Sequence, residues 1–202
     1  MNANEIAFYN LLEKMAEMFD LEGTDEALQT SIALREAIGP GVPDPATPYV
    51  LDKMVQDGLR SAVHPGAIAV RQAHPVLQWG ATSILDDYAP SSVSRHFTAV
   101  SLMGPGQFIE HESLRAGLYM QTPNSYYPLH NHEATETYVI LQGHAEWTIG
   151  DVTENYGPNK IIHHTPYQPH AFQTFDAPLL AFWRWGGNIA VDTYRMLDDP
   201  KS

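Results

Sequence analysis

The sequence contains no cysteine, which excludes disulfide bonds and thiolate metal ligands. Basic residues are also scarce: 11 lysines and arginines stand against 24 aspartates and glutamates, so the formal net charge is -13. A field of this sign repels phosphate backbones, and no cluster of lysine or arginine is present to bind a lipid surface. We therefore expect neither nucleic acid nor a membrane as a partner.

Long apolar runs are absent as well. No segment reaches the roughly 18 apolar residues that a membrane span requires, and residues 1–5 do not begin the pattern of a signal peptide. Together with the missing cysteines, this predicts a cytoplasmic protein. The 202 residues, of which 44% are hydrophobic, are enough for one compact domain with its own core.

Residues 1–64 are predicted to form a helical extension. Apolar side chains recur there at spacings of three and four residues, which makes one stripe of an amphipathic helix: Phe8, Leu11, Leu12, Met15, Met18 and Phe19. A second helix is predicted over residues 25–37, ended by Gly-Pro-Gly at 39–41, and a third over 50–59. We expect these helices to pack on the outside of the main domain or on a second subunit.

Residues 65–202 are predicted to form a β domain, because short runs of strand-forming residues alternate with Gly, Pro, Asn and Asp breaks. The predicted strands are residues 67–70, 97–102, 117–121, 136–141, 145–149, 160–163, 171–175 and 179–185. Many short strands with regular turns indicate a sandwich or barrel. The fold class is therefore mainly β, with an N-terminal α-helical extension.

The segment at residues 126–143, YYPLHNHEATETYVILQG, carries a cluster of chemically active side chains. Four of them share parity and would point to one side of an extended strand: His130, His132, Glu136 and Tyr138. Two imidazoles and a carboxylate that converge form a good site for a divalent transition metal. The fourth ligand must come from another strand, and His170 is the natural candidate because a predicted strand follows it.

His163 and His164 stand close to His170 in the sequence. Adjacent residues of a strand point to opposite faces, so at most one of the pair can face inward. We assign a structural or surface role to each.

The spacing His-x-His, three residues, Glu, six residues, Gly resembles the first motif of the cupin family. It is met by His130, His132, Glu136 and Gly143. The second cupin motif, Pro-x-Gly-x-x-His, corresponds to Pro166–His170 without its glycine and one residue shorter. The resemblance implies a cupin fold, a jelly-roll barrel of the double-stranded β-helix type, with one divalent metal ion. Cupins often dimerise, so a homodimer is one option.

A narrower resemblance is to the cupin lyases of dimethylsulfoniopropionate of the DddQ type. It rests on Tyr138, two residues after the motif glutamate, and on the pair Tyr126-Tyr127 ahead of the first histidine. Members of that family split dimethylsulfoniopropionate into dimethyl sulfide and acrylate. The resemblance implies that Tyr138 acts as the base and that Tyr127 assists it.

The reaction suits these residue types. A metal that holds the substrate carboxylate stabilises the charge formed when the neighbouring carbon loses a proton. A tyrosine has an ordinary pKa of roughly 10, which a nearby cation lowers toward the working range of a base. The sulfonium group is a cation that aromatic faces can bind, and we expect Tyr126, Trp183 and Trp185 to supply them.

Two alternatives remain at this stage. The same ligands suit an iron-dependent cupin dioxygenase that acts on a small organic acid or thiol. A non-catalytic cupin that binds a small molecule would also carry them. The ligand types suit zinc, iron or manganese, so the sequence does not choose the metal.

Overall fold

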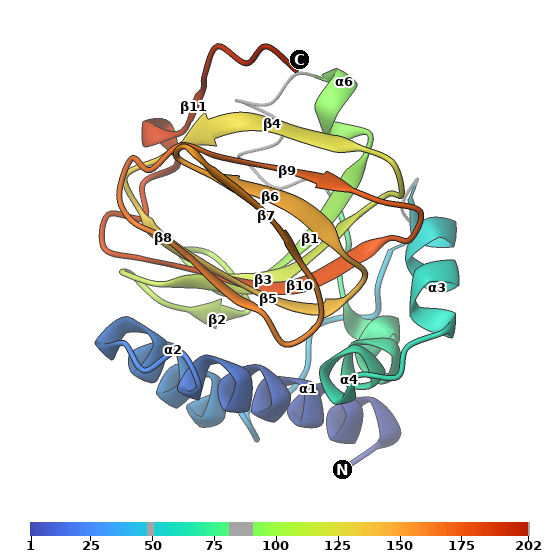
Figure 1. Ribbon diagram of the computed structural model, residues 1–202. Helices are drawn as coiled ribbons and strands as arrows, with labels where there is room; N and C mark the ends of the chain where they lie inside the picture. Colours follow the sequence, from blue (N-terminus) through green and yellow to red (C-terminus); the bar gives the residue numbers. More distant parts are fainter. Residues whose placement is uncertain (48–50, 81–90, 202) are drawn as a thin grey trace.

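The centre of the computed structural model, which describes residues 1–47, 51–80 and 91–201, is a pair of facing β-sheets (Figure 1). One sheet has six strands in the order β2-β1-β3-β10-β5-β8, and the other has five in the order β11-β4-β9-β6-β7. Within the described residues no strand pairing joins the two sheets. The predicted barrel is therefore an open sandwich of two sheets.

The strands of the six-stranded sheet are β1 (Phe97–Gly104), β2 (Ile109–Glu110), β3 (Arg115–Gln121), β5 (Thr135–Gln142), β8 (Ile161–His164) and β10 (Leu179–Gly186). Those of the five-stranded sheet are β4 (Tyr126–Asn131), β6 (Ala145–Ile149), β7 (Val152–Tyr156), β9 (His170–Thr174) and β11 (Arg195–Met196). Every predicted strand from residue 97 onward is confirmed within two residues at each end. Strands β2, β4, β7 and β11 were not among the predicted strands. Of these, β2 and β11 have two residues each, and β7 is polar and exposed along nearly its whole length.

Gly143 closes the turn between β5 and β6, and its backbone explains why the motif has a glycine there. Its φ is +80°, in the left-handed region, and an added Cβ would lie 2.3 Å from the carbonyl oxygen of Pro178. Any larger residue would therefore be strained and would also displace the strand that follows Pro178.

The predicted N-terminal helices are confirmed as α1 (Ala3–Asp20), α2 (Asp25–Glu36) and α3 (Asp52–Arg60). Helix α1 begins at a capping box, in which the Asn2 side chain accepts from the Glu5 amide at 3.0 Å and Glu5 accepts from the Asn2 amide at 2.7 Å. The apolar stripe of α1 is buried, as its spacing predicted. The predicted start of the third helix, residue 50, lies outside the described residues.

The predicted strand at residues 67–70 is wrong, because this segment lies in helix α4 (Pro65–Ala73). Ile68 and Val70 resemble a strand, but Pro65 occupies the first turn and the His64 side chain caps the Gly66 amide. The helix is followed by the short turn η1 (His74–Val76). Helical structure thus continues beyond residue 64, and the division of the chain into two parts at that point stays a prediction.

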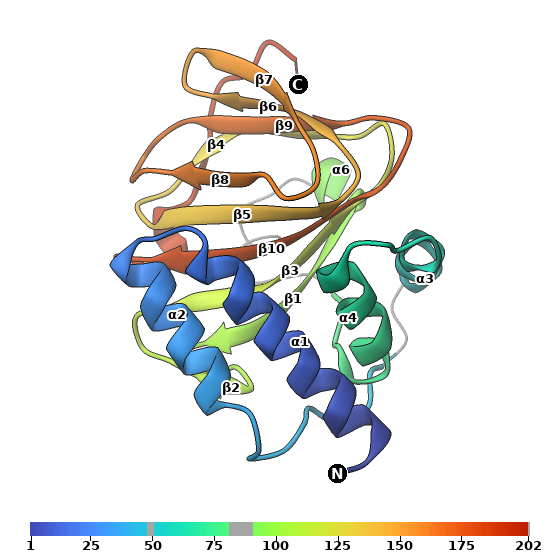
Figure 2. The same ribbon diagram turned by 60° about the horizontal axis from the view of Figure 1, so that its bottom comes forward.

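Helices α1, α2 and α4 cover the outer face of the six-stranded sheet (Figure 2). Side chains of α1 such as Phe8, Leu12 and Phe19 share one hydrophobic core with Leu118 and Phe182 of that sheet. This arrangement matches the expectation that the helices pack on the outside of the main domain. No described helix is both long and apolar enough to cross a membrane. A second core, rich in aromatic residues, fills the space between the two sheets.

A buried ion pair fastens the α1–α2 turn to the sheet. The guanidinium of Arg184 on β10 is fully buried and donates twice to the carboxylate of Glu22, at 2.8 Å from Nε and by a second bond from Nη2. Its Nη1 lies 3.6 Å from Glu26 on α2. Burial alone would raise the pKa of Glu22, but His163 and Arg184 lower it to about 2.

The lowered pKa of Glu22 predicts that the free energy of unfolding depends on pH in the acid range. Its unfolded-state value is near 4.5, so its contribution is complete above that pH and is lost as pH falls toward 2. We expect the free energy of unfolding to fall more steeply in this window for the natural chain than for Glu22→Gln, measured by urea titration at each pH. The exposed Glu112→Gln is the control and should follow the natural chain. Parallel curves for Glu22→Gln and the natural chain would contradict the prediction.

Candidate metal centre

The two halves of the His/Glu motif lie on different sheets. Strand β4 ends at Asn131 in the five-stranded sheet, and the chain crosses to begin β5 at Thr135 in the six-stranded sheet. The segment is therefore not one extended strand, and its side chains converge across the space between the sheets. His130 and His170 lie directly opposite each other in the β4–β9 ladder, which brings the histidine of the second motif to the first.

Three buried histidines orient their rings in the same way. Each places Nδ1 against a backbone carbonyl two residues away: His130 with Pro128 at 2.8 Å, His132 with Ala134 at 3.1 Å and His170 with Gln168 at 2.9 Å. A carbonyl oxygen can only accept, so Nδ1 carries the proton and Nε2 keeps a lone pair. The Nε2 atoms of His132 and His170 are buried with no hydrogen-bond partner among the described residues, which suits metal-ligating imidazoles.

Glu136 on β5 faces these histidines from the opposite sheet. Its Oε2 lies 3.4 Å from His132 Nε2 and 3.1 Å from His170 Nε2, and its Oε1 accepts from the indole of Trp185 at 2.6 Å. Burial alone would raise the pKa of Glu136, but the imidazoles around it, His132 foremost, lower it well below the ordinary value. The group is therefore an ionised carboxylate.

The donor set is chemically suited to a divalent transition metal. The ligand atoms of His130, His132 and His170 all lie within 4.8 Å of one another. Burial lowers the pKa of His130 well below the ordinary value, so its ring is neutral and able to coordinate. Three imidazoles and one carboxylate match the preferences of several such ions. These buried groups can therefore hold a metal ion.

His164 also belongs to this cluster, so a surface role for it is wrong. It lies opposite Glu136 in the β5–β8 ladder, fully buried, with its Nδ1 at 3.1 Å from Glu136 Oε2. Burial and the nearby His170 lower its pKa to about 3, so the imidazole is neutral. His163 faces away toward Glu22, which confirms that only one of the pair points inward.

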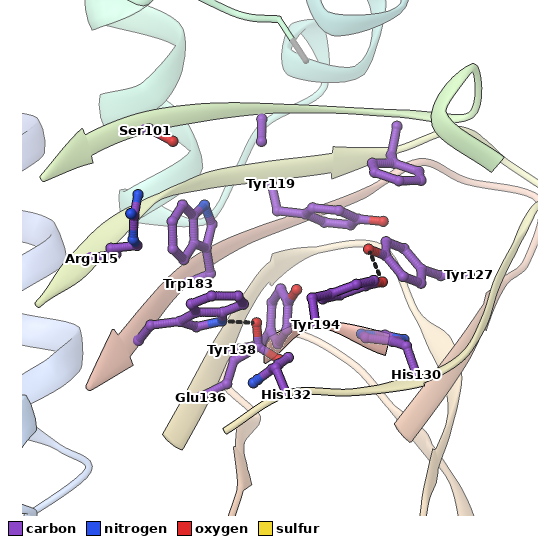
Figure 3. Close-up of a pocket in the computed structure, with 13 residues that line it drawn as sticks. Ser101, Arg115, Tyr119, Tyr127, His130, His132, Glu136, Tyr138, Trp183 and Tyr194 are labelled. Carbon is purple, nitrogen blue, oxygen red and sulfur yellow. Dashed lines mark hydrogen bonds and ion pairs between the residues drawn. The ribbon is translucent and has the colours of Figure 1, made fainter. Parts of the chain in front are cut away.

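The centre opens into a cavity of about 60 Å³ between the sheets. In Figure 3, Arg115 and Trp183 lie toward one end and Tyr127 and His130 toward the other. Glu136, His132 and Tyr138 lie between them.

Tyr138 and Tyr127, the two tyrosines given catalytic roles from the sequence, both line the cavity. Tyr138 is two residues beyond Glu136 on β5 and points to the same side. Burial, and then the charge of Glu136, raise the pKa of Tyr138 well above its ordinary value. The Tyr127 hydroxyl is 2.8 Å from that of Tyr194, and its ring packs 4.5 Å from that of His130 between centroids.

Of the aromatic residues expected at the substrate, two reach the cavity and one does not. Trp183 and Trp185 both line it, as their shared parity predicted. The ring of Trp185 also packs on His132, with centroids 4.4 Å apart. Tyr126 lies on the other side of β4, where its hydroxyl donates to Asp199 at 2.7 Å.

The lining residues that were not singled out from the sequence include Tyr119, Arg115 and Tyr194. Tyr119 and Arg115 share parity on β3, so the alternation of that strand could have revealed them. Tyr194 stacks on His130 with centroids 5.2 Å apart, but it follows the short turn η2 (Val191–Thr193), where no motif marks it.

Removing one imidazole tests the ligand assignment. We expect His132→Ala to lower metal affinity by more than the roughly 10- to 100-fold that loss of an outer partner costs, because an empty position would remain in the coordination shell. The measurement is elemental analysis after dialysis against a weak chelator. His144→Ala, at an exposed histidine, is the matched control and should keep its metal. Equal metal content in the two variants would exclude His132 as a ligand.

Comparisons with known proteins agree on one family of lyases. The family model for dimethylsulfoniopropionate lyase matches residues 28–181. The lyase DddQ of Ruegeria pomeroyi is 30% identical over 198 residues, which cover 94% of each protein.

Solved structures agree with this result. The crystal structure of DddQ from Ruegeria pomeroyi superposes with a TM-score of 0.65 at 29% identity, covering 91% of this chain and 92% of that one. A chain from the crystal structures of the lyases RdDddP and RnDddQII gives a TM-score of 0.72 at 22% identity, covering 96% and 100%, and supports the fold. The predicted cupin fold and the predicted family are both confirmed: the chain belongs to the dimethylsulfoniopropionate lyase family.

Proposed function

We propose that this chain is a carbon–sulfur lyase that cleaves dimethylsulfoniopropionate into dimethyl sulfide and acrylate at a metal centre. The ligands are His130, His132, Glu136 and His170. The observation that carries the proposal is that these groups converge beside Tyr138, at the wall of an aromatic cavity, in a chain of this family.

The metal is one divalent transition ion, with zinc, iron and manganese as the candidates. When bound, such an ion supplies a positive charge that stabilises the developing negative charge on the substrate carboxylate. Trp185 fixes one oxygen of Glu136, so the carboxylate presents the other oxygen toward His132 and His170. The protein thus holds the ligands in place before the ion arrives.

Tyr138 is the proposed base. Burial and Glu136 raise the pKa of Tyr138, so the phenolate depends on the nearby positive charge that a bound ion would supply. As phenolate, its oxygen would accept the proton from the carbon next to the carboxylate. The electron pair of that C–H bond forms the carbon–carbon double bond, and the C–S pair leaves with sulfur as neutral dimethyl sulfide. Tyr127 assists by shaping the end of the cavity next to His130, together with its hydroxyl partner Tyr194.

The cavity also accounts for the two charges of the substrate. Among the described lining residues, Arg115 carries a permanent positive charge, which would attract a carboxylate. For the sulfonium, the aromatic faces of Trp183 and Trp185 are available in the same cavity. Tyr126 has no part in this wall, because it lies outside the cavity.

The test is a headspace assay for dimethyl sulfide with purified protein reconstituted with zinc, iron or manganese in turn. We expect release with at least one metal and none from His132→Ala. The family does not favour the two alternatives, but the same samples separate them. Oxygen consumption without dimethyl sulfide would indicate a dioxygenase, and a loaded protein without turnover would indicate a binding cupin.

A homodimer is part of the same proposal. Leu28 and Ile32 lie one turn apart on α2 and are 53% and 46% exposed, so the outer helices offer an apolar face. Sedimentation or light scattering of the purified protein measures the state directly.

A further inference from the structure

Among the described histidines of the metal centre, His164 alone presents Nδ1 to Glu136 rather than Nε2. Its Nδ1 is 3.1 Å from Glu136 Oε2. Its Nε2 points away from the centre and lies 3.0 Å from the indole nitrogen of Trp147, which donates to it. The position of His164 beside Glu136 would suit a metal ligand. The orientation of its ring, with Nε2 directed at Trp147, argues against that role.

The contact with Trp147 decides where the proton of His164 resides. An indole N–H can only donate, so Nε2 of His164 must keep its lone pair, and the neutral ring carries its proton on Nδ1. That proton points at Glu136 Oε2. A nitrogen that carries a proton cannot coordinate a metal ion, so Trp147 removes His164 from the ligand set.

We propose that His164 is a positioning residue whose Nδ1–H holds Oε2 of Glu136 in place as a metal ligand, with Trp147 fixing the tautomer. The inference rests on the proposed metal site. Trp185 holds the other oxygen at 2.6 Å, so both carboxylate oxygens have a donor and the plane of the group cannot rotate. Outer partners of this kind are typically worth about 10- to 100-fold in metal affinity.

The surrounding rings keep this chain of contacts rigid. The indole of Trp147 stacks on Phe172 with centroids 4.0 Å apart and planes inclined by 12°. The imidazole of His164 stacks in the same way on His170, at 3.9 Å and 12°. Trp147 comes from β6 and His164 from β8. The hydrogen bonds from Trp147 to His164 and from His164 to Glu136 therefore connect the two sheets, as the metal ligands do.

Two substitutions of His164 test the hydrogen bond from Nδ1 to Glu136, because both remove the imidazole ring and only one keeps a donor at the position of Nδ1. His164→Asn places an amide N–H where Nδ1 stood, whereas His164→Gln moves the amide to the position of Nε2. We expect His164→Asn to keep zinc affinity within about threefold and His164→Gln to lose about 10- to 100-fold, measured by chelator competition. Equal affinities in these two variants would overturn the role of the Nδ1–H.

Trp147→Phe tests the tautomer without touching the cluster. The ring can still stack on Phe172, but the N–H is gone. In nitrogen NMR of histidine-labelled, metal-free protein, we expect His164 to show one tautomer in the natural chain and a mixture in Trp147→Phe. In cadmium-loaded natural protein, three histidines should show coupling to the metal through Nε2. Coupling to His164 would refute the positioning role, and an unchanged single tautomer in Trp147→Phe would refute the part assigned to Trp147.

The outcomes also distinguish this inference from the proposed function. If the natural chain binds no metal, the proposed centre fails, while the tautomer of His164 in the metal-free protein still reports on Trp147. If the natural chain binds metal and releases dimethyl sulfide but all His164 variants bind zinc equally, only the positioning role fails.

Discussion

Replacing Tyr138 by phenylalanine is expected to abolish measurable release of dimethyl sulfide while metal content stays complete. The ring keeps its packing against Trp147, with centroids 5.2 Å apart in the natural chain, so the wall of the cavity is preserved. Only the oxygen that would accept the proton is removed. General bases typically contribute about 10²- to 10⁴-fold to a rate, and we expect a loss in that range or beyond it.

The matched control is Tyr119→Phe, which removes a hydroxyl from another ring of the same wall. That hydroxyl donates to Gln121 at 2.8 Å, so it is already engaged in the protein and is not assigned a proton-transfer role. We expect this variant to retain most of the activity. Near-normal release from Tyr138→Phe, measured by headspace gas chromatography with metal content determined in parallel, would remove Tyr138 as the base.

Replacing Arg184 by methionine is expected to destabilise the protein by about 3–5 kcal/mol, because it leaves Glu22 as a buried charge without its main partner. For a chain of this size, that corresponds to a fall in the unfolding midpoint of about 10 °C. Differential scanning calorimetry of the metal-free protein measures it without interference from ligand binding.

Two comparisons make the Arg184 result specific. Arg60→Met breaks an exposed pair with Asp57, in which the arginine side chain is 79% exposed, and should cost no more than about 1 kcal/mol. The double variant Glu22→Leu with Arg184→Met should be more stable than Arg184→Met alone, since both buried charges are then gone. If Arg184→Met is no worse than Arg60→Met, the pair does not fasten the α1–α2 turn.

The metal ligands were predictable because their spacing is local. His130, His132 and Glu136 lie within seven residues, and a short motif records them. His164 was not predictable in the same way, since its place beside Glu136 depends on the register of the β5–β8 pairing across a connection of about twenty residues. Sequence patterns indicate which face of a strand a residue occupies, but they do not indicate which residue lies across from it.

For the helices, in contrast to the pairing of strands, a pattern within one segment was enough for prediction. The spacing of apolar residues predicted α1 and α2, since amphipathic periodicity is a property of one segment. The segment at residues 67–70 was too short for periodicity to decide, and its β-branched residues outweighed Pro65 in the prediction. The structure shows that burial of Ala67, Ala69 and Val70 against the neighbouring helices and sheet favours the helix.

The division of the ligands between two unpaired sheets has a mechanical consequence. His130 and His170 belong to the five-stranded sheet, His132 to the segment that crosses between the sheets, and the carboxylate of Glu136 to the six-stranded sheet. An ion bound by all four side chains would link two sheets that share no backbone hydrogen bonds between strands in the described part of the chain. Metal binding would then stabilise the folded sandwich by about 2.7 kcal/mol at a free ion concentration one hundred times the dissociation constant. Binding of the ion would therefore also fix the distance between the two sheets, and with it the width of the cavity that admits the substrate.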